Sequence, residues 1–195
     1  MTLDTSKNMG GIGALLVVIA PVGMGTIAGV LGLVGLILLL IALKGLADHY
    51  KEKAIFDNAL YAFILTVVGV VAVVAVVVVT ALATLSRLGF DMFNMTQWSQ
   101  FGSMFANMAN FNNLWTFISS IIIGLVVIFA FTIFAAFLFR KSMDSLAAKT
   151  KVSLFGTTGL IMLIGAALTI IAVGFLLIWV SFILLTVAFF SIKTK

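Results

Sequence analysis

Four long apolar stretches leave this chain very few ways to fold. They run from Gly10 to Leu43, from Ala59 to Leu85, from Leu114 to Phe139 and from Leu154 to Ile192. None contains Asp, Glu, Lys, Arg or His, and each exceeds the roughly 20 apolar residues that a helix needs to cross a bilayer. A backbone in lipid must also satisfy its own hydrogen bonds, as a helix does. The sequence therefore predicts an all-α membrane protein, a polytopic transmembrane helix bundle.

The lengths of the stretches predict the number of helices. The second and third would each span roughly 40 Å, which suits a single tilted crossing. The first and last, about 34 and 39 residues long, would reach roughly 50 to 60 Å against a hydrocarbon core of about 30 Å, so each must be broken. Breaks are available at Pro21 to Gly25 and, less clearly, at Gly165 and Gly174. We predict six helices, with two central single spans flanked by terminal helical hairpins.

The first stretch leaves alternatives open. Its leading half, Met9 to Ala20, is too short for a comfortable span and could instead form a re-entrant or interfacial helix. Five or four crossings therefore remain alternatives to six. Whether the first stretch crosses once, twice or is re-entrant stays open.

Basic residues predict the orientation. They gather in two connections and at the tail: Lys44, Lys51 and Lys53; Arg140, Lys141, Lys149 and Lys151; Lys193 and Lys195. Only Arg87 borders the connection between the second and third stretches. By the positive-inside rule, the three basic segments and both termini are cytoplasmic, and Ser86 to Asn113 is external. The aromatic residues expected at the outer interface are Trp98, Trp115 and Trp179, and those expected at the inner one are Tyr50 and Tyr61.

Residues 1–195 are expected to form a single transmembrane domain, because no Pro-, Ser- or charge-rich linker divides them. The external loop, residues 86–113, alternates Met, Phe and Trp with Asn, Gln and Ser, a pattern that predicts an amphipathic helix at the membrane surface. This helix could alternatively cover a pore mouth or dock a partner. Asn94, followed by Met95 and Thr96, is a candidate glycosylation site on that external side.

Small residues in the first stretch predict close helix packing. Gly25, Gly29 and Gly32 share one helix face, and Gly35 lies on the adjacent face. Packing within the bundle is the favoured interpretation, and self-association is the alternative. The expected partners are membrane lipid and either another protein or further copies of this chain.

The polar residues offer little chemistry. The chain has no cysteine and one histidine, which excludes disulfides, thiolate metal sites and cysteine nucleophiles. Asp48, His49 and Glu52, with Asp144, could form a small metal or acid–base site, but a solvated helical connector explains them better because one imidazole makes a poor metal site. The net charge of +5 forms no continuous stripe, so nucleic acid is not expected. No catalytic, cofactor or metal residues are predicted.

Several segments resemble a family of archaeal integral membrane proteins that is defined only as a domain of unknown function. They are Leu43 to Tyr50, Phe56 to Tyr61, Gly165 to Ile171 and Ala188 to Ile192. The resemblance implies a multi-pass protein of an archaeal cell membrane. It brings no catalytic residues to this chain.

The absence of charged side chains from the four apolar stretches limits the functions that the protein can have. Proton pumps, ion-coupled transporters and voltage sensors usually need charge inside the membrane. We therefore expect a non-enzymatic integral membrane protein, an accessory or structural subunit of a membrane assembly. The alternative is a small transporter or channel for an uncharged or weakly polar solute, with hydroxyl groups along its route: Thr66, Thr80, Thr84, Ser119, Ser120, Thr132 and Thr169.

Overall fold

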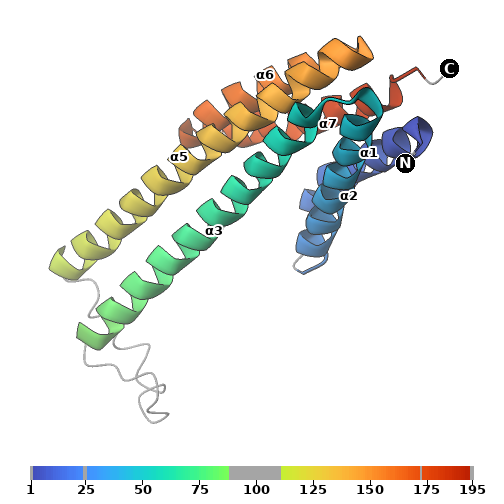
Figure 1. Ribbon diagram of the computed structural model, residues 1–195. Coiled ribbons are helices and arrows are strands. Elements are labelled where there is room, and N and C mark those ends of the chain that lie inside the picture. The colour runs from blue at the N-terminus through green and yellow to red at the C-terminus, as the bar shows by residue number, and fades with distance from the viewer. Residues whose placement is uncertain (1, 24–25, 88–110, 172, 194–195) are drawn as a thin grey trace. The chain divides into compact units, whose positions relative to one another are not determined.

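The computed structural model describes residues 2–23, 26–87, 111–171 and 173–193. Over these ranges it contains only helices (Figure 1). In chain order they are α1 (Leu3–Ile19), the 3₁₀ helix η1 (Ala20–Val22), α2 (Thr26–Tyr50), α3 (Lys53–Arg87), α5 (Phe111–Thr150), α6 (Leu154–Ala167), the 3₁₀ helix η3 (Thr169–Ile171) and α7 (Val173–Phe190). The predicted all-helical class, with two long central helices flanked by helical hairpins, is confirmed for the described residues.

Five of the described helical segments are long and apolar enough to cross a membrane. They are Leu3–Val22, Thr26–Tyr50, Lys53–Ala83, Ile122–Thr150 and Val173–Phe190. α6 is shorter, at 14 residues, and η3 follows it after Leu168. By length and composition, the described residues therefore contain five candidate membrane spans.

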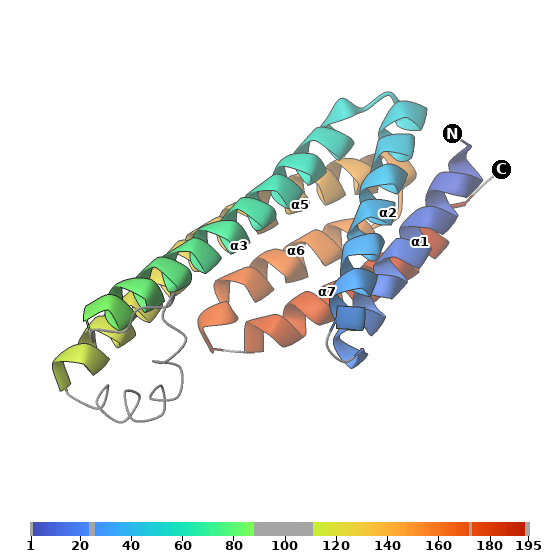
Figure 2. The ribbon, with the colours of Figure 1, turned by 90° about the horizontal axis from the view of Figure 1, so that it is seen from below.

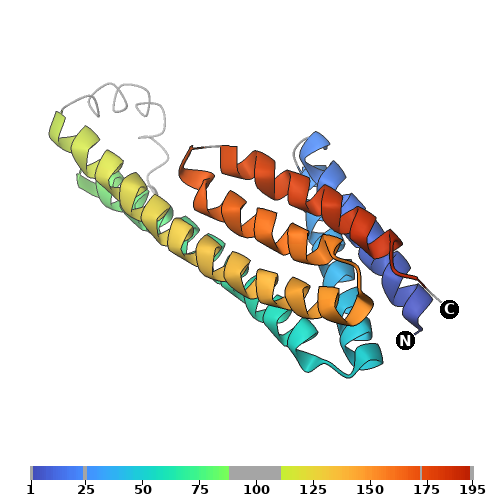
Figure 3. The same cartoon turned by 90° about the horizontal axis from the view of Figure 1, so that it is seen from above.

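The chain divides into two compact units. Unit 1 comprises residues 1–66 and 132–195, and unit 2 comprises residues 67–131. Unit 1 contains the α1–α2 and α6–α7 hairpins, with α1 packed against α7, together with the first part of α3 and the last part of α5 (Figure 3). Unit 2 contains the remainder of α3 and α5, which approach closely where a methyl group added at Gly69 would lie 2.8 Å from the Cβ of Phe131. α3 and α5 each have residues in both units, so the division does not decide whether the chain forms one domain. The expected single domain stays a prediction.

Helix ends extend beyond the apolar stretches. α1 begins at Leu3, where the Thr2 hydroxyl accepts a hydrogen bond from the Thr5 amide at 3.2 Å and Asp4 occupies the first turn. Met9 to Ala20 alone is short for a span, but the residues before Met9 lengthen the helical segment to the 20 residues of Leu3–Val22, which is long enough to cross. Whether it crosses or is re-entrant stays a prediction. The Thr2 cap lets the helix begin at Leu3, before the apolar stretch. The length of the apolar stretch gives no information about such a cap.

The two basic connections are also shorter than expected. α2 continues to Tyr50 and α5 to Thr150, so each connection is reduced to a tight turn. Lys51 and Lys151 adopt left-handed backbone conformations in these turns, with φ of 51° and 59°. The connection from α2 to α3 contains two residues, and the connection from α5 to α6 contains three.

The start of α1, the end of α7 and both lysine turns lie at one end of unit 1, the basic end (Figure 2). The Lys7 ammonium donates to the Ile192 carbonyl at 2.7 Å, which joins the start of α1 to the end of α7. Lys149 lies 3.1 Å from the Glu52 carboxylate, which joins the two turns. The start of α1 and the end of α7 therefore lie together, and the cytoplasmic placement of both termini stays a prediction.

The Lys7 contact gives a first test. Lys7→Met removes a half-buried, charge-assisted hydrogen bond, which should lower the free energy of unfolding by about 1 to 2 kcal/mol. Lys193→Met, at an exposed position of the same end, should change it by less than about 0.5 kcal/mol. Unfolding of each purified variant in detergent measures both. If both variants lose the same free energy of unfolding, the Lys7 hydrogen bond does not contribute specifically to stability.

Candidate functional site

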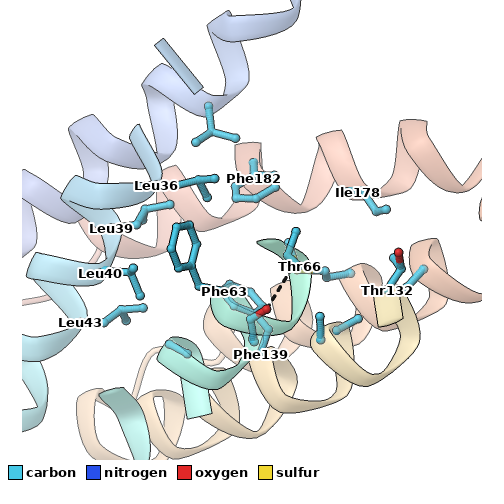
Figure 4. Close-up of a pocket in the computed structure, with 17 residues that line it drawn as sticks. Leu36, Leu39, Leu40, Leu43, Phe63, Thr66, Thr132, Phe139, Ile178 and Phe182 are labelled. Atoms are coloured by element: carbon cyan, nitrogen blue, oxygen red, sulfur yellow. Dashed lines mark hydrogen bonds between the residues drawn. The ribbon is translucent and has the colours of Figure 1, made fainter. Parts of the chain in front are cut away.

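The interior of unit 1 holds a partly open apolar cavity of about 350 Å³ (Figure 4). Its volume lies within the range of small-molecule and lipid-chain pockets. All six α-helices of the described ranges contribute to its wall. The lining residues are Val17 from α1; Leu36, Leu39, Leu40 and Leu43 from α2; Ala59, Ala62, Phe63 and Thr66 from α3; Thr132, Ala135, Ala136 and Phe139 from α5; Met162 and Ala166 from α6; and Ile178 and Phe182 from α7.

The cavity exists because small side chains meet where large ones would fill the space. Ala62 on α3 and Ala136 on α5 are each 5% exposed, and Ala166 on α6 is fully buried. Leucine and phenylalanine from α2 and α7 form the facing wall. Protein interiors are normally close-packed, so a void of this size marks a place where another molecule can lie.

Only two hydroxyl groups reach this wall. The Thr66 hydroxyl donates to the Ala62 carbonyl of its own helix at 2.9 Å, as the dashed line in Figure 4 shows. Thr132, the other hydroxyl residue, lies on α5. The lining contains no charged side chain, so the cavity suits an apolar occupant.

Two basic residues continue the cavity-lining helix faces toward the basic end. On α2, Leu36 and Leu40 line the cavity, and Lys44 follows at the same four-residue spacing. The Lys44 ammonium lies 6.0 Å from the centre of the Phe56 ring on α3. The cationic side chain thus leans across the α2–α3 boundary next to the cavity.

The same arrangement occurs on α5. Thr132 and Ala136 line the cavity, and Arg140 follows one turn later. Arg140 lies 3.6 Å from Asp144 in a partly exposed ion pair. Exposed pairs of this kind contribute little stability, so the guanidinium can exchange partners at small cost.

The glycines predicted to pack have different surroundings. A methyl group at Gly35 would lie 2.7 Å from the Gly13 carbonyl oxygen, and one at Gly32 would lie 3.6 Å from the Ala20 side chain. Nothing lies within 4 Å of such a group at Gly29. Gly25 lies outside the described residues. Close contact to α1 is therefore concentrated at Gly35.

Sequence reasoning missed other glycine contacts. A methyl group at Gly13 would lie 2.7 Å from the Gly35 carbonyl oxygen, so the two glycines face each other across the α1–α2 hairpin. Gly165 and Gly174 face each other in the same way across the α6–α7 hairpin, and Gly10 lies against the Phe189 ring of α7. The sequence shows where these glycines occur and so indicates close helix packing, but it does not show which helix each glycine contacts.

The acidic residues of the basic end have structural contacts. Glu52 pairs with Lys149, Asp144 pairs with Arg140, and the His49 ring stands edge-on to Tyr50 at 5.0 Å. Among the described residues, no group of three or more His, Asp or Glu side chains could hold a metal ion. The solvated connector stays the predicted interpretation of this segment.

Most described hydroxyls of the proposed solute route bond to their own helices. Thr80 donates to the Val76 carbonyl and Thr169 to the Ala166 carbonyl, each at 2.8 Å. Ser119 also has an interaction partner. The side chains of Thr84 and Ser120 lie outside the described part of the chain. Of the seven residues, Thr66 and Thr132 line the cavity.

Other expected features lie partly beyond the described ranges. Asn94, Trp98 and nearly all of the predicted amphipathic segment fall outside them. Trp179 lies in unit 1 and donates its indole N–H to the Val18 carbonyl at 2.9 Å, near the α1–α2 turn. This places Trp179 toward the end of unit 1 opposite the lysine turns, and its position at the outer interface stays a prediction.

Residues 31–183 match the model of a family described as "Protein of unknown function (DUF996)". The chain belongs to this family. The DUF996 match includes every cavity-lining residue except Val17. The chain is also 27% identical over 192 residues to "Uncharacterized protein MJ1644" of Methanocaldococcus jannaschii, and the alignment covers 98% of this chain and 94% of that archaeal relative. No solved structure matches the chain significantly.

The DUF996 relationship agrees with the resemblance found in the sequence. It assigns no substrate, partner or catalytic residue to the cavity or to the basic end. Any function proposed for unit 1 must therefore be argued from the arrangement of its own residues.

Proposed function

We propose that this DUF996 protein is a non-enzymatic, multi-pass component of the archaeal cell membrane that serves as an accessory or structural subunit of a membrane assembly. The glycine-mediated packing of its hairpins supports the proposal most. Gly13 with Gly35, and Gly165 with Gly174, bring helix backbones into direct contact. Close contacts of this kind make a rigid body in lipid, where packing replaces the hydrophobic drive.

The rest of unit 1 fits a scaffold better than a reaction centre. Its largest fully buried side chains are mostly apolar, and Phe155 and Phe189 stack edge-to-face at 5.3 Å. The buried Ser142 hydroxyl donates to the Ile55 carbonyl, which ties α5 to α3. Such contacts fix helices relative to one another and place no nucleophile beside a base.

Purification from the native membrane tests the subunit role. The protein, extracted in mild detergent after cross-linking, should migrate with a defined partner or as an oligomer of fixed size. Membranes that are extracted without cross-linker and then heated to dissociate complexes are the control. A strict monomer without a partner across several detergents would contradict the role.

A second candidate function, passage of a weakly polar solute, has one observation in its favour. Thr66 and Thr132 come from different helices and line the same cavity. Solute entry into proteoliposomes should then fall in the Thr66→Val, Thr132→Val double variant, which keeps the side-chain shape and removes both hydroxyls. Vesicles that stay impermeable with the wild-type protein would exclude this function.

A further inference from the structure

We propose that the unit 1 cavity is a lipid-binding site that takes one hydrocarbon chain of an anionic membrane lipid, with the lipid headgroup at Lys44 and Arg140. The inference rests on membrane placement of the helices and goes beyond the subunit role. It requires no protein partner, so the two proposals can fail separately.

The lining decides the chemical class of the occupant. A water molecule needs two to four polar partners to be stable in a cavity. The cavity offers only Thr66 and Thr132, and the Thr66 hydroxyl already donates to Ala62. Apart from the shorter α6, the walls come from helices long and apolar enough to cross a membrane, so hydrocarbon is the medium available to fill the space.

The volume decides between a chain and a helix. A helix has a diameter of about 10 Å with its side chains, and a cylinder of that width holding 350 Å³ is only about 4 to 5 Å long. That is less than one helical turn, so the cavity favours a slender chain over an inserted helix. A slender hydrocarbon chain fits the same volume over a useful length.

A neighbouring groove extends the apolar path. Val17, Ile178 and Phe182 line both the cavity and a groove bounded by Pro21, Phe175 and Trp179. The groove lies toward the α1–α2 turn, and the cavity reaches Leu43 beside the basic end. A chain that enters at the basic end therefore has apolar wall along its whole course.

Charge decides the headgroup. Lys44 and Arg140 each stand one helical turn beyond a cavity-lining residue, on two different helices. Basic residues between membrane helices on the cytoplasmic side bind anionic headgroups, and a phosphate accepts charge-assisted hydrogen bonds from both residue types. A chain in the cavity and a phosphate at its basic end together describe one anionic lipid.

Native mass spectrometry of the purified chain tests the site. The protein is released from nanodiscs containing equal parts phosphatidylglycerol and phosphatidylcholine with matched acyl chains, and the retained lipid is counted. We expect one tightly held lipid, mostly phosphatidylglycerol. Ala136→Phe fills the cavity and should lower retention of both lipids about tenfold or more.

Matched variants separate this effect from loss of folding. Ala130→Phe places the same ring at an exposed position of α5 and should retain lipid like the wild type. Ala62→Phe fills the cavity from α3, with exposed Ala75→Phe as its control, in case Ala136→Phe does not fold. Folding is checked by helical circular dichroism and by the size-exclusion profile.

The charged residues give an independent readout. Lys44→Gln with Arg140→Gln should abolish the preference for phosphatidylglycerol and leave phosphatidylcholine retention in place. The proposal is overturned if folded Ala62→Phe and Ala136→Phe retain lipid like their controls, if a polypeptide or second copy is found in place of lipid, or if the wild type shows no preference for the anionic lipid.

Discussion

Gly35→Leu is expected to destabilise unit 1 strongly, lowering the free energy of unfolding by about 3 kcal/mol or more. Even a methyl group at Gly35 would lie 2.7 Å from the Gly13 carbonyl oxygen and 3.0 Å from the Val17 amide nitrogen. These neighbours are helix backbone, which cannot rotate away as a side chain can. The α1–α2 hairpin must therefore separate to admit the leucine. Thermal unfolding in detergent, followed by circular dichroism, measures the loss.

Gly29→Leu is the matched control for this change. Gly29 lies on the same helix, yet nothing comes within 4 Å of a methyl group placed there. Leucine also favours the helical state over glycine, so Gly29→Leu should be neutral or slightly stabilising. A loss at Gly29 as large as that at Gly35 would mean that helix propensity or detergent effects, rather than the Gly13 contact, dominate.

A double variant sharpens the interpretation. Gly13→Leu should cost about as much as Gly35→Leu, because a methyl group at Gly13 would lie 2.7 Å from the Gly35 carbonyl oxygen. Once the helices have separated at one glycine, the second leucine meets little further resistance. The combined loss should therefore fall well short of the sum, as expected for residues in direct contact.

The sequence predicted the helices better than it predicted their ends. The lengths of the apolar stretches and the Pro21 break give the number and order of the described helices, because lipid imposes one geometry on an apolar backbone. α1 starts six residues before Met9 because Thr2 caps it, and α5 continues through the basic segment to Thr150. The length of an apolar stretch does not show whether the helix continues into the polar residues on either side of it.

The sequence did not allow us to predict which helices contact one another or where the cavity lies. The pattern of Gly25, Gly29, Gly32 and Gly35 indicates small helix faces, but nothing in it shows that Gly35 meets Gly13 while Gly29 meets nothing. The cavity depends on several alanines from different helices facing one another. Alanine is so common in the apolar stretches that only the three-dimensional arrangement shows which ones leave a void.

Cysteine labelling should give an all-or-none answer on membrane topology. The chain has no cysteine, so each introduced thiol is the only target for a membrane-impermeant maleimide. Lys53→Cys, Ala148→Cys and Lys193→Cys, at exposed positions of the basic end, should react only when inside-out vesicles expose the cytoplasmic face. Ser86→Cys, near the far end of α3, should react only from the external face.

The two hairpin turns decide whether the first stretch is re-entrant. Val22 is 77% exposed and Ile170 is 75% exposed, so a cysteine at either position is accessible to reagent if its turn leaves the bilayer. Six crossings require Val22→Cys and Ile170→Cys to react from the external face, together with Ser86→Cys. The 20-residue segment Leu3–Val22 is long enough for this result. Reaction of Val22→Cys from the cytoplasmic face, or reaction only after detergent is added, would instead make the first hairpin re-entrant and reduce the crossings to four.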